Sequence, residues 1–166
     1  MKKITLLIIA LSFALSASSQ TIVDTAVSNK NFSTLVTALK AADLVGALSG
    51  DGPFTVFAPN NDAFAKIDSK TLSSLLEPGN VKALSNILTY HVVSGKLLAA
   101  DVANALKAGE GKAKLKSLNG QELTAISKYE KIYLIDAKGG MSEIIATDVI
   151  GTNGVIHVVD TVVMPE

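Results

Sequence analysis

The stretch "GDGPFTVFAPNNDAFAKI", residues 50–67, changes abruptly from a strand pattern to a helix pattern. Residues Phe54 to Phe57 are mostly aromatic or β-branched, which favours a short strand. Asn60 is well placed as the N-cap of the following helix, because its side-chain oxygen can accept a backbone amide of the first turn. Asp62 lies in that turn, where the helix dipole favours negative charge. Pro59 keeps its predecessor extended, so local chemistry explains the junction without catalysis.

The sequence before this junction predicts helices. Phe32, Leu35, Val36 and Leu39 recur at helical spacing. After the junction, a further amphipathic helix is expected to begin near a cap at Asn80. Shorter helical segments are expected at 44–48, 69–76 and 97–106.

The character of the chain changes to strands after Gly111. Asn119-Gly120 lies between two β-like runs, which is a strong hairpin signal. The last strand, within residues 155–163, is apolar on both faces, so we expect it in the middle of a sheet that is covered on both sides. Helices first and strands later, with one early strand, predict an α+β fold.

The N-terminus has the pattern of a secretory signal peptide. Lys2 and Lys3 precede a short apolar run, Ile4 to Leu15, and small residues follow it. We therefore expect a signal at residues 1–19 and one domain at 20–166, which has no stable membrane insertion after cleavage. A retained membrane anchor is the alternative, although the apolar run is short for a membrane span.

Composition excludes several chemistries. The chain has no cysteine, which excludes thiol catalysis, thiolate metal sites and a lipoprotein signal. Two of the 15 lysines lie in the expected signal, which leaves 13 against 15 acidic residues, a net charge of −2. The chain also has no arginine, so a nucleic-acid partner is not expected.

Three segments resemble the fasciclin domain family. "TVFAPNNDAF" is similar to its first signature, "YHVVSGKLLAADV" to its central Tyr-His segment, and "NGVIHVVDTVVMP" to its second signature. They occur in the right order between Thr55 and Pro165. Asn60 stands where the family more often has Ser or Thr, and it caps equally well. Residues of these motifs with an expected structural role are Thr55, Phe57, Pro59, Asn60, Phe64, His157 and Asp160.

The resemblance implies a wedge-shaped β-sandwich with several short helices packed around it. It also implies a secreted, periplasmic or surface-associated module for cell adhesion, without catalysis and without a cofactor or metal. Its partner would be a cell-surface or extracellular matrix protein or polysaccharide. The alternative is an exported protein with an unrecognised ligand pocket or hydrolytic site.

The two histidines, His91 and His157, are the first candidates for chemistry. His157 shares a strand face with valines, which favours a structural role, and Asp160 lies on the opposite face. Ser49 does not lie in a nucleophile-elbow pattern. Two separate histidines with scattered carboxylates do not form a zinc pattern. A carboxylate pair for sugar cleavage stays open, because such pairs are close in space and not in sequence.

The resemblance also implies partner-binding residues. In animal fasciclin-type domains a Tyr-His segment flanked by branched apolar residues is associated with integrin contact, and the matching residues are Tyr90 and His91. An Asp-aliphatic pair before the second signature matches Asp148 and Val149. The alternative for the Tyr-His segment is a place in the core, because its apolar neighbours have helical spacing.

Overall fold

The last strand of the chain lies in the middle of the sheet, as its two apolar faces predict. In this computed structural model, which describes residues 20–166, β7 (Gly154–Val159) lies between β1 (Phe54–Pro59) and β6 (Met141–Gly151). It is parallel to β1 and antiparallel to β6. The expected signal peptide, residues 1–19, lies outside the described residues.

One seven-stranded sheet supplies both layers of the expected sandwich. Its order is β2-β1-β7-β6-β5-β4-β3. The long strand β6 belongs to both layers, because its first residues pair with β5 and its later residues, after two register shifts, pair with β7. The two ends of the sheet approach each other where the Leu118 amide donates to the Val92 carbonyl at 2.8 Å. The remaining strands are β2 (Val92–Ser94), β3 (Lys112–Lys116), β4 (Glu122–Lys128) and β5 (Lys131–Ile135).

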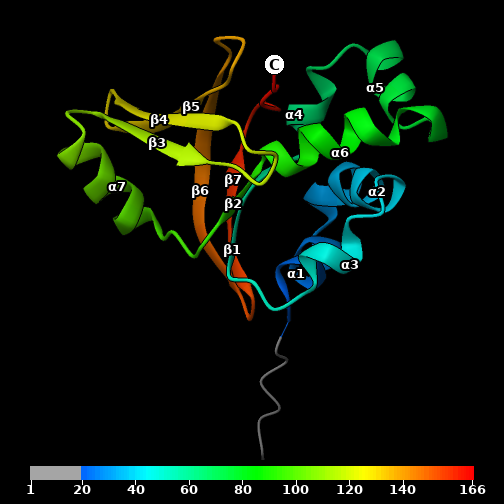
Figure 1. Cartoon of the computed structure of the whole chain (residues 1–166), viewed down its shortest axis with the longest axis horizontal. Coiled ribbons are helices and arrows are strands. Elements are labelled where there is room, and N and C mark those ends of the chain that lie inside the picture. Colours follow the sequence, from blue (N-terminus) through cyan, green and yellow to red (C-terminus); the bar gives the residue numbers. More distant parts are fainter. Residues whose placement is uncertain (1–19) are drawn as a thin grey trace, which may run out of the picture.

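Helices cover the two faces of the central strands unequally. Figure 1 shows α1 to α6 gathered on one side of β1 and β7, whereas α7 lies beside β3 and β4. Ile156 of β7 packs in the core beneath the first group, and Val159 packs in a second core with α7 and β3 to β5. The α+β fold class is therefore confirmed. The helices are α1 (Ile22–Ser28), α2 (Ser33–Ala41), α3 (Val45–Leu48), α4 (Asn61–Ala65), α5 (Ser69–Leu75), α6 (Val81–Tyr90) and α7 (Ala99–Ala108), with 3₁₀ turns at Lys30–Phe32 and Pro78–Asn80.

The strand-to-helix junction has the predicted geometry. β1 ends at Pro59, and the Asn60 side chain accepts the Ala63 amide at 2.8 Å at the start of α4. Asn80 also precedes a helix as expected, but its side chain makes no cap hydrogen bond. Its amide nitrogen instead donates to the Ser74 carbonyl at 2.7 Å and so links α6 to the preceding helix.

Asn153 attaches the N-terminal helices to the β6–β7 hairpin. Its buried side chain accepts the Ile22 amide at 2.9 Å and donates to the carbonyls of Leu48 and Gly50, each at 2.8 Å. The next residue, Gly154, lies where β7 approaches β1 closely, since a Cβ there would sit 2.1 Å from the Phe54 carbonyl oxygen. The Asn-Gly pair thus serves long-range packing as well as the turn.

We predict that Asn153→Ala destabilises the protein by about 2–4 kcal/mol, because the buried backbone groups of Ile22 and Leu48, and the more exposed Gly50 carbonyl, lose their partner. Urea unfolding measures the change in free energy. Thr152→Ala, at the exposed neighbouring position, is the control and should change stability by no more than about 0.5 kcal/mol. Equal losses in the two variants would contradict the role of Asn153.

Candidate functional site

His91 connects α6, β1 and the C-terminal segment through hydrogen bonds. Its side chain is 2% exposed. Nδ1 lies 2.8 Å from the Ile87 carbonyl oxygen, and Nε2 accepts the Val163 amide at 3.1 Å. Since Nε2 is an acceptor, the proton is on Nδ1 and the ring is neutral. The His91 carbonyl also accepts the Phe57 amide at 2.9 Å.

Burial lowers the pKa of His91 to about 4, because a charged imidazole would lose its hydration there. The Ile87 carbonyl and the more distant Asp136 carboxylate act in the opposite direction without offsetting this effect. His91 therefore stays neutral in the folded protein over the range in which a free histidine takes up a proton.

Tyr90 is also internal, with 0% of its surface exposed. Its hydroxyl donates to the Glu122 carbonyl at 3.0 Å, and burial raises the pKa of the phenol. For Tyr90 and His91 this geometry favours the alternative of a place in the core. Both side chains point into packed structure, where their hydrogen bonds to distant backbone groups stabilise the fold.

Thr55 and His157 hold the segment between β2 and α7. Thr55 Oγ1 donates to the Gly95 carbonyl at 2.7 Å and accepts the Leu97 amide at 2.8 Å. His157 Nε2 lies 2.7 Å from the Leu97 carbonyl oxygen, and its ring stacks on Phe57 with centroids 5.6 Å apart. Both polar side chains are fully buried, as a structural role requires.

Asp148 links His157 to the start of α7. Its backbone amide donates to His157 Nδ1 at 3.3 Å, and its Oδ1 accepts the Ala99 amide at 2.8 Å. Asp148 has φ 58°, so the irregular part of β6 turns there. The carboxylate nevertheless remains exposed, whereas Val149 is half-buried against the first core.

Asp160 does not contact His157, as expected from its strand face. Burial opposes its ionisation, but the Glu143 amide and the hydrogen bonds from Lys66 and Thr161 prevail and lower the pKa of the carboxyl. Its Oδ1 accepts the Glu143 amide at 2.8 Å, and Oδ2 pairs with Lys66 at 3.1 Å. Asp160 thereby joins β6 and α4 to the end of β7.

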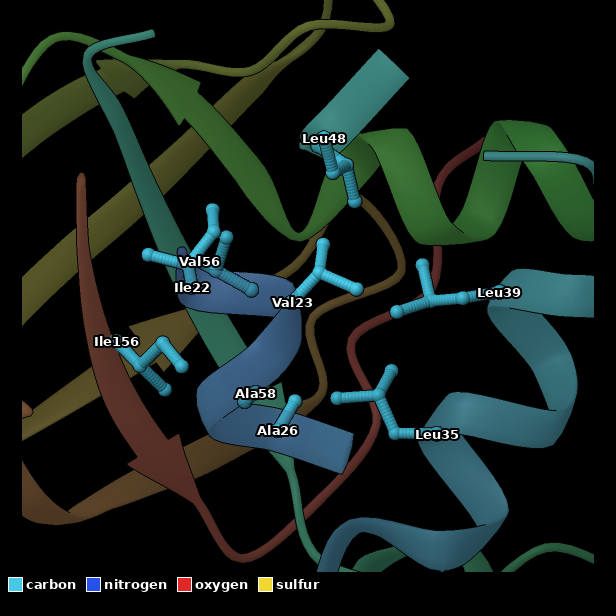
Figure 2. A pocket seen from close by; sticks show the side chains of 9 residues that line it. All are labelled: Ile22, Val23, Ala26, Leu35, Leu39, Leu48, Val56, Ala58 and Ile156. Carbon is cyan, nitrogen blue, oxygen red and sulfur yellow. The ribbon is translucent and has the colours of Figure 1, made fainter. Parts of the chain in front are cut away.

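An apolar cavity lies between α1, α2 and the sheet. The volume of this cavity is about 20 Å³. An apolar cavity that admits benzene has a volume of about 150 Å³. Figure 2 shows that the side chains around it come from both helices, α3 and the strands. In this conformation the cavity is too small for an organic ligand. Its lining is Ile22, Val23, Ala26, Leu35, Leu39, Leu48, Val56, Ala58 and Ile156.

Sequence reasoning missed Asn153 and the capping role of Asp148. An asparagine before glycine signals a turn, but nothing near it in the sequence points to Ile22, 131 positions away. The contact from Asp148 to Ala99 spans 49 positions. The only local signals were the turn signal of Asn153-Gly154 and the polar side chain of Asp148.

Comparison with known proteins identifies the family. The model of the fasciclin domain matches residues 30–165, so the chain belongs to the fasciclin domain family, and the resemblance in the three motifs is confirmed. Protein sll1483 of Synechocystis is 50% identical over 154 residues, which cover 93% of this chain and 78% of that protein. The cell surface glycolipoprotein MPB83 of Mycobacterium bovis is 32% identical over 142 residues, 82% of this chain and 57% of that protein.

A solved pair of FAS1 domains from the insect cell adhesion molecule Fasciclin I has the same fold. The TM-score is 0.75, and the match covers 86% of this chain and 50% of that one. Since the sequences are 18% identical, this likeness concerns the fold alone. Between residues 20 and 166, no helix is long and apolar enough to cross a membrane.

We predict that acid weakens the fold through His91. Well above pH 6.5, the imidazole is neutral in both the folded and the unfolded chain. Between pH 6.5 and 4 only the unfolded chain gains the proton, so the free energy of unfolding falls by up to about 3 kcal/mol. Urea titrations across this range should show a smaller fall in His91→Gln than in the wild type. Parallel profiles would contradict the prediction.

We predict that His157→Ala lowers the free energy of unfolding by about 2–4 kcal/mol, because it leaves a cavity and removes the partners of Asp148 and Leu97. The urea midpoint should fall clearly. Thr147→Ala, an exposed change in β6, is the control. An unchanged midpoint together with lost partner binding would instead make His157 a binding residue.

Proposed function

We propose that this protein is a non-catalytic binding module of the cell exterior, exported after loss of residues 1–19. It attaches to a cell-surface or extracellular matrix component, either a protein or a polysaccharide. The observation that carries this proposal is the use of the signature side chains. Thr55, His91 and His157 each bind backbone groups of another segment, which leaves the module to act through its surface.

One relative supports the proposal: MPB83, which is 32% identical to this chain, is a cell surface glycolipoprotein. The cavity in Figure 2 is small, and its lining side chains are apolar, so they offer a substrate no polar group. This cavity therefore does not favour the alternative of a ligand pocket or hydrolytic site.

Asp148 and Val149 remain our predicted partner contact, because the Asp148 carboxylate is exposed at a turn of β6. This carboxylate also caps α7 through Oδ1. A test must therefore separate its charge from its hydrogen bond. Asparagine at this position keeps the accepting oxygen and removes only the charge.

We predict that the full-length product, immobilised on beads, retains envelope fragments of the cells that make it. Asp148→Asn should weaken retention several-fold at an unchanged thermal midpoint, since an interfacial charge is lost while the cap persists. Asp43→Asn, an exposed change on the helical side, is the control. If the wild type retains no envelope component, the binding function itself is contradicted. If Asp148→Asn binds like the wild type, the predicted contact is wrong.

A further inference from the structure

The sheet has one uncovered side, formed by β3, β4, β5 and the beginning of β6. We call the outward side chains of these strands the outer face. Ala113 and Leu115 of β3 point inward and are buried in the core with α7. The lysines that alternate with them along the strand point outward. The register extends this alternation across the ladder, where Ile126 lies opposite Tyr133 and Ile135 lies opposite Met141.

The centre of the outer face is apolar. Ile126, Tyr133 and Ile135 are half-buried, and Met141 is 43% exposed. In an antiparallel sheet with one buried side, the solvent side normally carries polar residues. These four side chains form cross-strand neighbours on the side that the core does not use. Apolar surface of this kind marks an interaction site.

The rim of the outer face is basic. Its outward residues include five lysines and two glutamates, a net charge of +3, whereas residues 20–166 together carry −2. The two glutamates are paired, Glu122 with Lys114 at 2.9 Å and Glu143 with Lys131 at 2.7 Å. Positive charge is thus concentrated in the strands of this face, while the C-terminal residue Glu166 lies near Lys114 and Ile135 at its edge.

Three lysines of this rim have no carboxylate partner within residues 20–166: Lys112, Lys116 and Lys128. Lys112 and Lys128 flank Ile126 and Tyr133 at the end of the face near the β4–β5 turn. At the other end Asp136 is near the surface, but the amides of Lys138, Gly140 and Met164 surround its carboxylate.

The β4–β5 turn adds an aromatic residue at the edge of the face. Tyr129 and Glu130 form a two-residue hairpin loop between Lys128 and Lys131, with φ values of 51° and 62°. Such loops favour Asn-Gly, because other residues are strained at positive φ. Tyr129 is 82% exposed. The Lys128 ammonium lies over its ring, with Nζ 5.2 Å from the ring centroid. The fold gains little from this tyrosine, so we attribute it to binding.

We propose that the outer face, with Tyr129 at its edge, docks an acidic protein of the cell exterior. This inference rests on the proposed function and names a second contact surface, separate from Asp148 and Val149, together with its class of partner. The apolar centre and charged rim match the anatomy of a protein–protein interface. A second copy of the chain would place like charges against each other. A polyanion such as a polysaccharide would use the lysines but leave Ile135 and Met141 without a role.

The test combines cross-linking with three variants of the full chain. A benzophenone amino acid at position 129 or 141, in cells that make the protein, should form adducts with an acidic envelope protein, identified by mass spectrometry. The same probe at Val27, exposed on α1, is the control. Envelope retention by beads should fall about tenfold in Lys112→Glu/Lys128→Glu and in Ile135→Thr/Met141→Thr. Lys82→Glu, exposed on α6, should bind normally.

The third variant replaces Tyr129-Glu130 with Asn-Gly. It should raise the thermal midpoint by about 2–4 °C, because the strain at positive φ is relieved, and still lower retention about tenfold. A gain in stability with a loss of binding excludes unfolding as the cause.

Several results would overturn the inference. Retention that is normal in all three variants would leave the proposed function intact and move the binding surface elsewhere. Sensitivity to the lysine changes alone, with full competition by dextran sulfate, would mean a polyanion. Adducts between two copies of the chain would mean self-association. No retention by the wild type would contradict the proposed function itself.

Discussion

The position of β7 between two other strands is the constraint on which the rest of the structure depends. Its side chains are apolar on both faces, so each face has to be covered. The first four helices and α6 provide one cover, and α7 with the curled half of the sheet provides the other. Although β1 and β7 are parallel neighbours, the chain between them forms the other five strands of the same sheet, β2 to β6, together with α4 to α7. The close approach of β1 to Gly154 fixes the position of this pair.

Polar side chains complete the same arrangement where strands end and the chain changes direction. Thr55, His91, His157 and Asn153 lie in buried positions and bind backbone groups that regular pairing leaves free. In the described part of the chain, every buried side-chain nitrogen or oxygen has a partner. A buried polar group without one costs about 1–3 kcal/mol, so these residues make this packing much more stable than alternatives that leave them unpaired.

Local physics explains which parts of the fold were predictable from the sequence. The cap at Asn60, the hairpin at Asn119-Gly120 and the central place of β7 depend on neighbouring residues or on strand periodicity, and the structure has all three. The partners of Tyr90 and Asp148 lie 32 and 49 positions away, respectively. A sequence pattern does not show which residues this far apart in the chain lie close in space. For Tyr90 the sequence therefore left both a surface contact and a place in the core open.

The two kinds of unusual residue in this protein have different physical meanings. The buried histidines and Asn153 break the apolar pattern of the core, but their hydrogen bonds compensate for the cost. Tyr129 has a strained backbone with only the cation–π contact to Lys128 in return, and the apolar centre of the outer face departs from the polar pattern usual for the solvent side of a sheet. Consistency across levels is the normal state of a folded sequence, and uncompensated exceptions concentrate where a protein binds. The signature motifs thus define the family through its fold, whereas the choice of partner is expected at positions that the fold does not need.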